Sequence, residues 1–340
     1  MKIIVDVMGS DKGCAEMTQG VCDAVEEYKI EAVAVGNAAE VAPIVEQRGL
    51  SEKIRIVDAP DFISMDDDSA LVRTSKSGSS MVVGMKALAA GEGDAFVTAG
   101  STGAAITAAT LYIKRIRGIR RASLAPTIPT LEGGAILIDC GANADCTPEY
   151  LLQFAYMGSY YASVELGKDS PRVALLNNGT EKTKGDELRQ QTYALLEAAG
   201  AEGRINFVGN IEGRDVLYGG ADVIVADGFS GNILLKSVEG TAMFLMEQIK
   251  SALTKSFKSK IGALLVKKDI YAIKKMMNYK EIGGSPLVGV KAPVIKAHGS
   301  ADAYTMKNAI ARAVRFAQGG IVGKISDNVE LMKLPSGSAE

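Results

Sequence analysis

The chain has 340 residues, 47% of them hydrophobic, with 38 basic and 40 acidic side chains and a formal net charge of -2. Such a chain buries a sizeable core as one large domain or two closely joined ones, and its charge balance excludes a general attraction to nucleic acid. With one histidine and no C-x-x-C pair among four cysteines, it is typical of neither a zinc protein nor a disulfide scaffold, so we expect no metal and reduced thiols.

The first residues run directly into a segment that is typical of a strand, at 2–7. They lack the basic, apolar and small-residue regions of a signal peptide. No apolar stretch reaches the roughly 18 to 20 uncharged residues that a membrane-spanning helix needs. We therefore expect a cytoplasmic protein whose contact with a membrane, if it has one, is peripheral.

Apolar segments of strand length alternate with amphipathic segments of helix length along the chain. This alternation predicts an α/β fold with a largely parallel sheet covered by helices. The predicted strands lie near 2–7, 31–35, 54–57, 95–99, 124–128, 135–139, 172–177, 205–208, 223–227 and 293–297. We expect a single domain over 1–333 and a frayed tail over 334–340.

Five of these strands are each followed at once by a glycine-rich or polar turn. The segments are IIVDVMGSD (3–11), AFVTAGSTG (95–103), AILIDCGAN (135–143), VALLNNGTEKTKG (173–185) and VIVADGFSGN (223–232). The carboxyl ends of parallel strands lie on one edge of a sheet, and ligands bind in the crevice there. The five turns therefore predict one composite active site.

The GSTG turn at 100–103 precedes a predicted helix over 104–115. Backbone N–H groups at a helix N-terminus, together with the hydroxyls of Ser101 and Thr102, form a candidate anion site. The alternative is a simple helix cap.

After this helix come five basic residues, Lys114, Arg115, Arg117, Arg120 and Arg121. They are either a solvated helix end or a docking surface for an acidic protein partner.

Two later turns carry further candidates for chemistry. Cys140 ends a strand and is either a small buried hydrophobe or an acyl-accepting nucleophile partnered by His298.

The turn at 177–185 is not a Walker A loop, because Lys184 precedes its second glycine and no Ser or Thr follows. Lys184 is the best candidate cation of the five turns, and the alternative is an exposed loop lysine.

The last two candidates lie at 227–232 and 298. Ser230 is a plausible helix cap and Asn232 can donate its side-chain amide to an oxyanion. His298 stands at a strand-to-helix turn, where it can contact an anion or a proton in transit, or be structural. The chain has neither a G-x-G-x-x-G nor a G-x-S-x-G motif, so it supports neither a dinucleotide site nor a nucleophile elbow.

A basic segment from 250 to 275 contains eight lysines and a single acidic residue, a local net charge of +7. Apolar residues at helical spacing precede it, and others follow around Gly262, which we expect to break the helix. The pattern predicts a helical hairpin over 240–280. The residues of its apolar tip are Phe257, Ile261, Leu264 and Leu265. The hairpin serves dimerisation, insertion into an anionic membrane surface, or both.

Together these segments resemble the bacterial phosphate acyltransferase family, which makes acyl-phosphate from acyl-acyl-carrier-protein for phospholipid synthesis. The resemblance extends over VDVMGSD, SSMVVGMKAL, DAFVTAGSTGA, LAPTIPT, DCGANADCTPEYLLQFAYMGS, LLNNGTEKTKGDEL, FVGNIEGRD, ADVIVADGFSGNILLK and PVIKAHGSADA. The chain departs from the family at Gly9-Ser10, where two glycines are usual, and in lacking a proline shortly after Asp11.

The resemblance implies a three-layer α/β/α sandwich, related to phosphotransacetylases and to the isocitrate dehydrogenase group, with a protruding helical hairpin. It implies a homodimer without a cofactor, bound peripherally to the inner face of the cell membrane. The partners would be acyl carrier protein, inorganic phosphate and a downstream membrane acyltransferase that uses acyl-phosphate. Arg115, Arg117, Arg120 and Arg121 would then dock the carrier protein.

The resemblance also implies a set of site residues. They are Asp6, Gly9, Ser101, Thr102, Asn143, Asn177, Thr180, Lys184, Asp227, Gly231, Asn232 and His298. Lys184 would hold phosphate with the GSTG amides, Asn232 would face the oxyanion, and His298 would orient phosphate or take its proton. The alternatives are a coenzyme A-dependent short-chain phosphate acyltransferase, a non-enzymatic lipid-responsive scaffold and, more distantly, a nicotinamide dehydrogenase.

Overall fold

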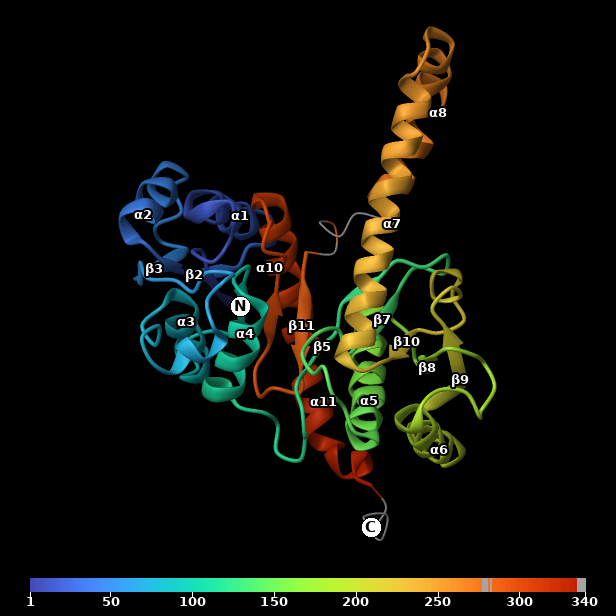
Figure 1. The fold of residues 1–340 in the computed structure, drawn as a ribbon. Helices are drawn as coiled ribbons and strands as arrows, with labels where there is room; N and C mark the ends of the chain where they lie inside the picture. The colour runs from blue at the N-terminus through green and yellow to red at the C-terminus, as the bar shows by residue number, and fades with distance from the viewer. Residues whose placement is uncertain (277–280, 282, 335–340) are drawn as a thin grey trace.

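The computed structural model describes residues 1–276, 281 and 283–334. These residues form an α/β fold with two mostly parallel sheets rather than the one sheet expected (Figure 1). The seven-stranded sheet has the order β3-β2-β1-β4-β12-β11-β5, and the five-stranded sheet has the order β6-β7-β10-β8-β9. In the first sheet only β11 runs antiparallel to its neighbours, and in the second only β6 does.

The strands are short and most of their residues are buried. Those of the larger sheet are β1 (Lys2–Asp6), β2 (Glu31–Gly36), β3 (Ile54–Asp58), β4 (Ala95–Thr98), β5 (Ser123–Leu124), β11 (Ser285–Val288) and β12 (Val294–Lys296). Those of the smaller sheet are β6 (Thr127–Ile128), β7 (Ala135–Ile138), β8 (Arg172–Asn177), β9 (Asn206–Glu212) and β10 (Val223–Val225). Continuous apolar runs such as Ile3-Ile4-Val5 form the central strands because helices cover both faces of a parallel sheet.

Helices flank both sheets. They are α1 (Gly13–Tyr28), α2 (Ala38–Gln47), α3 (Ser80–Ala89), α4 (Thr102–Ala108), α5 (Pro148–Glu165), α6 (Glu187–Ala201), α7 (Gly228–Thr254), α8 (Phe257–Met276), α10 (Ala303–Gln318) and α11 (Ile321–Asp327). Single turns of 3-10 helix lie at η1 (Ser69–Arg73), η3 (Val216–Tyr218) and η4 (Val329–Met332), and a π-helical turn lies at η2 (Ala109–Ile113).

The alternation of side chains along the strands separates the two faces of each sheet. Ile3 and Val5 join the core formed with α1 and α10, whereas Ile4 joins the core formed with α3 and α4. In the smaller sheet, Ile136 joins the core with α5, and Leu137 packs with residues of α7. The expected three-layer α/β/α arrangement is therefore confirmed.

Two predicted elements differ from those observed. The strand expected over 124–128 is divided into β5 and β6, one in each sheet, and Pro126, which has no N–H to donate to a ladder, lies between them. The helix expected over 104–115 is α4 followed by the π-helical turn η2, and it ends at Ile113, before Lys114 with its φ of 69°. The basic run at 114–121 is therefore a loop, and the solvated helix end considered for it is wrong.

The protruding hairpin is confirmed for the described residues, because α7 and α8 project together away from both sheets (Figure 1). The turn lies at 255–256, and Gly262, expected to break the helix, lies within α8, where a glycine is tolerated at a cost of about 1 kcal/mol. Residues 277–280 of the predicted hairpin lie outside the described residues. Within the part of the chain that the structure describes, no helix combines the length and the hydropathy required to cross a bilayer.

Candidate functional site

A cavity of about 550 Å³ lies where the carboxyl ends of both sheets meet the first half of α7. Its volume is within the range of small-molecule sites. Most of its wall is apolar and comes from the β5–β6 connection and from α7. The principal lining residues are Leu124, Pro126, Ile128, Pro129, Leu235, Val238, Ala242, Cys140, Asp11, Thr102, Asn232, Lys236, Glu239, Lys296 and His298. The cavity therefore combines an apolar wall with a set of polar groups that includes three basic side chains.

Four of the five predicted turns contribute to this cavity. Asp11, Thr102, Cys140 and Asn232 represent the turns after β1, β4, β7 and β10, and His298 follows β12. The turn after β8 contributes no lining residue. Of the predicted site residues, the structure thus brings Thr102, Asn232 and His298 together at the cavity.

The turn after β1 is held by buried hydrogen bonds. The hydroxyls of Ser80 and Thr98 each donate to the Asp6 carboxylate at 2.7 Å, and burial raises the pKa of this carboxyl although these hydrogen bonds oppose the shift. A Cβ on Gly9 would lie 2.6 Å from the Cα of Gly100, so a glycine at this position allows the first two turns to touch. Asp6 and Gly9 therefore position the turns and do not line the cavity.

Ser10 has a defined role in the turn after β1. Its hydroxyl lies 3.1 Å from both the Gly299 and Ala301 carbonyl oxygens, to which it donates. The N–H of Asp11 donates to the Gly299 carbonyl as well, at 3.0 Å. The first turn is thus fastened to the turn that carries His298.

Ser101 is buried and caps α4, because its hydroxyl accepts a long hydrogen bond of 3.5 Å from the N–H of Ala104. This geometry favours the cap interpretation for Ser101. Thr102, the first residue of α4, lines the cavity.

The turn after β7 is organised by Asp139, a residue that the sequence analysis missed. Its carboxylate accepts hydrogen bonds from the backbone N–H groups of Leu124, Cys140 and Asn143, at 2.9, 2.7 and 2.7 Å, while burial raises its pKa. The Asn143 side chain donates to Asp139 at 3.0 Å and to the Ala122 carbonyl at 2.8 Å. Asn143 therefore shapes the turn.

The N-terminus of α7 lies directly against this turn. The N–H of Gly228 donates to the Asn143 carbonyl at 2.8 Å, and a Cβ on Gly231 would lie 2.0 Å from the Asp139 carbonyl oxygen. Since nothing larger than glycine fits there, Gly231 allows the approach that places Asn232 at the cavity.

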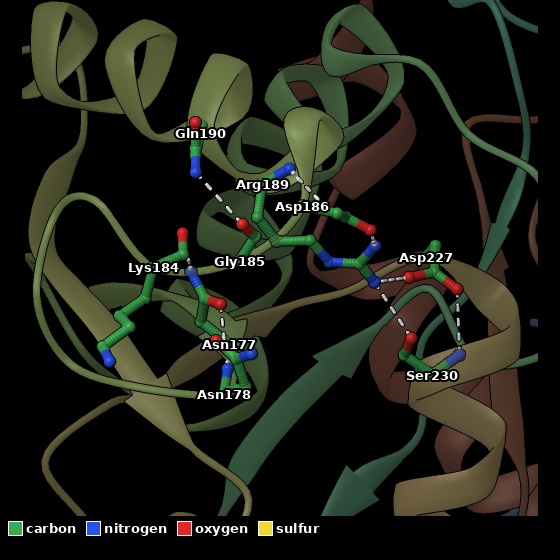
Figure 2. A network of polar contacts seen from close by, with 9 residues as sticks. All are labelled: Asn177, Asn178, Lys184, Gly185, Asp186, Arg189, Gln190, Asp227 and Ser230. Atoms are coloured by element: carbon green, nitrogen blue, oxygen red, sulfur yellow. Dashed lines mark hydrogen bonds and ion pairs between the residues drawn. The ribbon is translucent and has the colours of Figure 1, made fainter.

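Arg189, also missed from the sequence, connects the N-termini of α6 and α7 (Figure 2). Its guanidinium donates to Asp227, to the Ser230 hydroxyl at 2.9 Å and to Asp186 at 2.8 Å. Asp227 and Asp186 are themselves the N-caps of α7 and α6. The network therefore fixes the two helix starts relative to each other.

The turn after β8 is closed by Asn177, whose side chain donates to the Lys184 carbonyl at 3.2 Å. Thr180 and Lys184 are exposed, and the Lys184 side chain extends away from Arg189 and Asp227 (Figure 2). The proposed phosphate contact of Lys184 stays a prediction.

β12 ends with Lys296, a third residue missed from the sequence, and the turn after this strand carries His298. The Ser300 N–H donates to Nδ1 of His298 at 3.2 Å, so the neutral ring carries its proton on Nε2. Partial loss of hydration is the main cause that lowers the pKa of His298. The nearby ammonium groups of Lys236 and Lys296 lower it further. Burial lowers the pKa of Lys296 to about 8.

The basic run at 114–121 is partly engaged in intramolecular contacts. Arg115 forms a β-bridge with Val290, Arg120 pairs with Glu149 at 2.9 Å, and the Arg121 guanidinium lies 5.3 Å from the centre of the Tyr150 ring. Arg117 is exposed. The loop presents several positive charges on the surface.

Solved structures with this architecture include phosphotransacetylases and dehydrogenases. The enzyme from Streptococcus pyogenes has a TM-score of 0.61 at 18% identity, and that from Staphylococcus aureus a TM-score of 0.57 at 17% identity, with 94% of each chain covered in both comparisons. A 4-hydroxythreonine-4-phosphate dehydrogenase from Klebsiella pneumoniae has a TM-score of 0.53 at 14% identity, covering 93% of this chain and 98% of that one. The protein therefore has the phosphotransacetylase fold, which dehydrogenases share.

Sequence similarity defines the family more narrowly. A family model described as "Fatty acid synthesis protein" matches residues 1–324. A phosphate acyltransferase from Thermoanaerobacterium thermosaccharolyticum is 43% identical over 333 residues, 98% of each chain. One from Bacillus pumilus is 45% identical over 320 residues, 94% of this chain and 93% of that one. The chain belongs to the phosphate acyltransferase family and is an acyltransferase, which confirms the resemblance.

Proposed function

We propose that the protein transfers a long-chain fatty acyl group from acyl-acyl-carrier-protein to inorganic phosphate, reversibly. The observation that carries this proposal is the cavity, because its apolar wall suits an acyl chain and its basic groups suit a phosphoryl group. The product, acyl-phosphate, would serve a membrane acyltransferase that acylates glycerol phosphate. The names of the relatives support the transfer to phosphate.

In this reaction a phosphate oxygen attacks the thioester carbonyl carbon, a C–O bond forms, and the C–S bond breaks. The electron pair of the C–S bond leaves with sulfur, and the proton of hydrogenphosphate balances the thiol. Because a thiol has a pKa near 8.5, it departs with little acid assistance. Catalysis then rests on alignment of two reactants and on stabilisation of the tetrahedral oxyanion, for which the Asn232 amide is the proposed donor.

A covalent acyl-enzyme through Cys140 is not part of this proposal. Burial raises the pKa of the Cys140 thiol to about 12, and the thiolate is the nucleophilic form of cysteine. His298, whose Nδ1 accepts from the Ser300 N–H, would instead present Nε2 to phosphate. The raised pKa of the Cys140 thiol therefore favours direct attack by phosphate.

The decisive experiment incubates purified protein with long-chain acyl-acyl-carrier-protein and phosphate. Hydroxylamine traps acyl-phosphate, and free carrier protein is measured in parallel. We expect release of carrier protein that depends on phosphate. Activity on short-chain acyl-coenzyme A alone would favour the coenzyme A-dependent alternative, and no activity on either donor would favour a lipid-responsive scaffold.

Docking of the carrier protein is proposed for Arg115, Arg117, Arg120 and Arg121. Reversing two of these charges, in Arg117→Glu/Arg121→Glu, should raise the KM for acyl-acyl-carrier-protein about 10-fold, since two surface charge contacts together contribute on the order of 1.4 kcal/mol. Steady-state kinetics with each substrate varied in turn would measure this. The KM for phosphate serves as the internal control, and an unchanged KM for the carrier protein would contradict docking here.

Peripheral contact with the inner face of the cell membrane is proposed for the hairpin tip. Leu264 and Leu265 are 72% and 82% exposed, and Phe257 and Ile261 are exposed beside them. Each nearby lysine can add about 1 kcal/mol of attraction to an anionic surface. The exposed Met243, Phe244 and Leu245 of α7 are apolar surface suited to the proposed homodimer.

The variant Leu264→Glu/Leu265→Glu should reduce binding to anionic vesicles at least about 10-fold, because two exposed apolar anchors become charged. Flotation with and without anionic lipid measures this. Leu131→Glu, at a similarly exposed leucine between β6 and β7, is the matched control. Sedimentation of both variants reports the oligomeric state separately, and equal flotation of all three proteins would exclude the tip as the anchor.

A further inference from the structure

Lys296 is the most deeply buried basic side chain of the cavity. It ends β12 and lies in register with Thr98 of β4, which in turn lies opposite Asp6 of β1. These three residues form one row across adjacent strands at the carboxyl edge of the larger sheet. Lys296 is only 8% exposed and lines the cavity.

The surroundings of Lys296 leave its charge without a close counter-ion. Its ammonium donates to the carbonyl oxygens of Ala99, at 3.3 Å, and of Ala297. Among residues 1–276, 281 and 283–334, no carboxylate oxygen lies within 4.0 Å of this ammonium group. Asp6 and Asp11 attract it from farther away, and Asp6 already accepts from Ser80 and Thr98.

Burial of the Lys296 charge without a close counter-ion lowers the stability of the fold, because transfer of an unpaired charge out of water is strongly unfavourable. An ammonium has three N–H donors, and two of them have carbonyl acceptors here. A purely structural role leaves the cost of the charge unexplained. An anion in the cavity would supply both the missing counter-charge and the third acceptor.

The other basic groups of the cavity are less suited to this task. Lys236 pairs with Glu239 at 2.8 Å and its side chain is 53% exposed. His298 is exposed at the cavity surface, and its lowered pKa favours the neutral ring. The lysine of β12 is thus the cation that combines burial, fixed orientation and a charge left for a ligand.

We propose that Lys296 is a catalytic residue whose ammonium group binds the phosphoryl group in the cavity, first as inorganic phosphate and then as acyl-phosphate. Its two carbonyl acceptors hold the ammonium in place before the substrate arrives, which is the preorganisation that electrostatic catalysis requires. This assignment rests on the proposed function for the transfer step, but the binding of phosphate can be measured independently of turnover.

The test compares phosphate binding by calorimetry in wild type, Lys296→Met, Lys184→Met and Lys291→Met. We expect Lys296→Met to raise the Kd for inorganic phosphate at least about 10-fold, the scale of a hydrogen bond to a charged group. Lys291 is an exposed lysine five residues away, and its variant should bind as wild type does. Loss of phosphate binding in Lys184→Met with normal binding in Lys296→Met would overturn the assignment, as would the absence of phosphate binding to wild type.

A second measurement needs no variant and so does not depend on correct folding of Lys296→Met. Wild-type protein is acetylated with limiting acetic anhydride, and modification of Lys296 is quantified by peptide mass spectrometry. Inorganic phosphate should slow modification of Lys296 several-fold and leave Lys291 unaffected. Equal rates with and without phosphate would overturn the proposal. Binding and protection by phosphate without turnover of any acyl thioester would instead refute the proposed function alone.

Discussion

Gly231→Ala is expected to lower turnover about 10²-fold and to destabilise the fold by about 1–3 kcal/mol. The added Cβ would lie 2.0 Å from the Asp139 carbonyl oxygen, which is backbone and cannot turn aside. Either α7 or the turn after β7 must move, and overpacking of this kind has that cost. A shift of about 1 Å at Asn232 is enough to reduce a rate 10²-fold.

The matched control for this variant is Gly240→Ala, on the same helix. A Cβ at Gly240 meets no atom within 4 Å, and alanine in a helix interior is about 0.5–1 kcal/mol more favourable than glycine. Thermal unfolding and the acyl-phosphate assay would be applied to both variants. Wild-type turnover in Gly231→Ala would show that the approach of α7 to the turn after β7 does not position the site.

The sequence predicts the meeting of the turns, because a parallel strand that ends in a polar turn presents it at the carboxyl edge whatever the order of the strands. It does not predict which turns touch the cavity. In the smaller sheet, β10 separates β8 from β7, and the turn with Lys184 lines no part of the cavity. The order of strands is set by tertiary packing, which local patterns do not record.

Other residues escaped prediction because their surroundings come from distant parts of the chain. Lys296 ends a short apolar strand and, from the sequence alone, is typical of a solvated strand end. Its burial follows from its pairing with β4 and its contact with Ala99, which lie far away in sequence. Arg189 lies in the first turn of α6, and only the fold brings it to Asp227. The turn motifs DCGAN and VADG did mark Asp139 and Asp227 as aspartates at strand ends, a signal that could have identified both as turn organisers.

Arg189→Met is expected to lower the free energy of unfolding by about 3–5 kcal/mol, the usual cost of removing one partner of a buried ion pair. The Asp227 side chain is only 7% exposed and would lose its guanidinium partner. Urea unfolding measures the effect. Arg214→Met is the matched control, because Arg214 is 79% exposed and pairs only with surface carboxylates, so a change within about 0.5 kcal/mol is expected.

The double variant Arg189→Met/Asp227→Asn separates charge burial from positioning. The asparagine carries no charge but keeps an oxygen that can accept from the Ser230 N–H, as the Asp227 carboxylate does at 2.9 Å. Most of the lost free energy of unfolding should therefore return. We expect turnover below that of wild type in both Arg189→Met and the double variant, because both lack the link that Arg189 makes between the starts of α6 and α7. If turnover recovers together with stability, Arg189 acts only by neutralising Asp227, and the relative placement of the two helices does not depend on it.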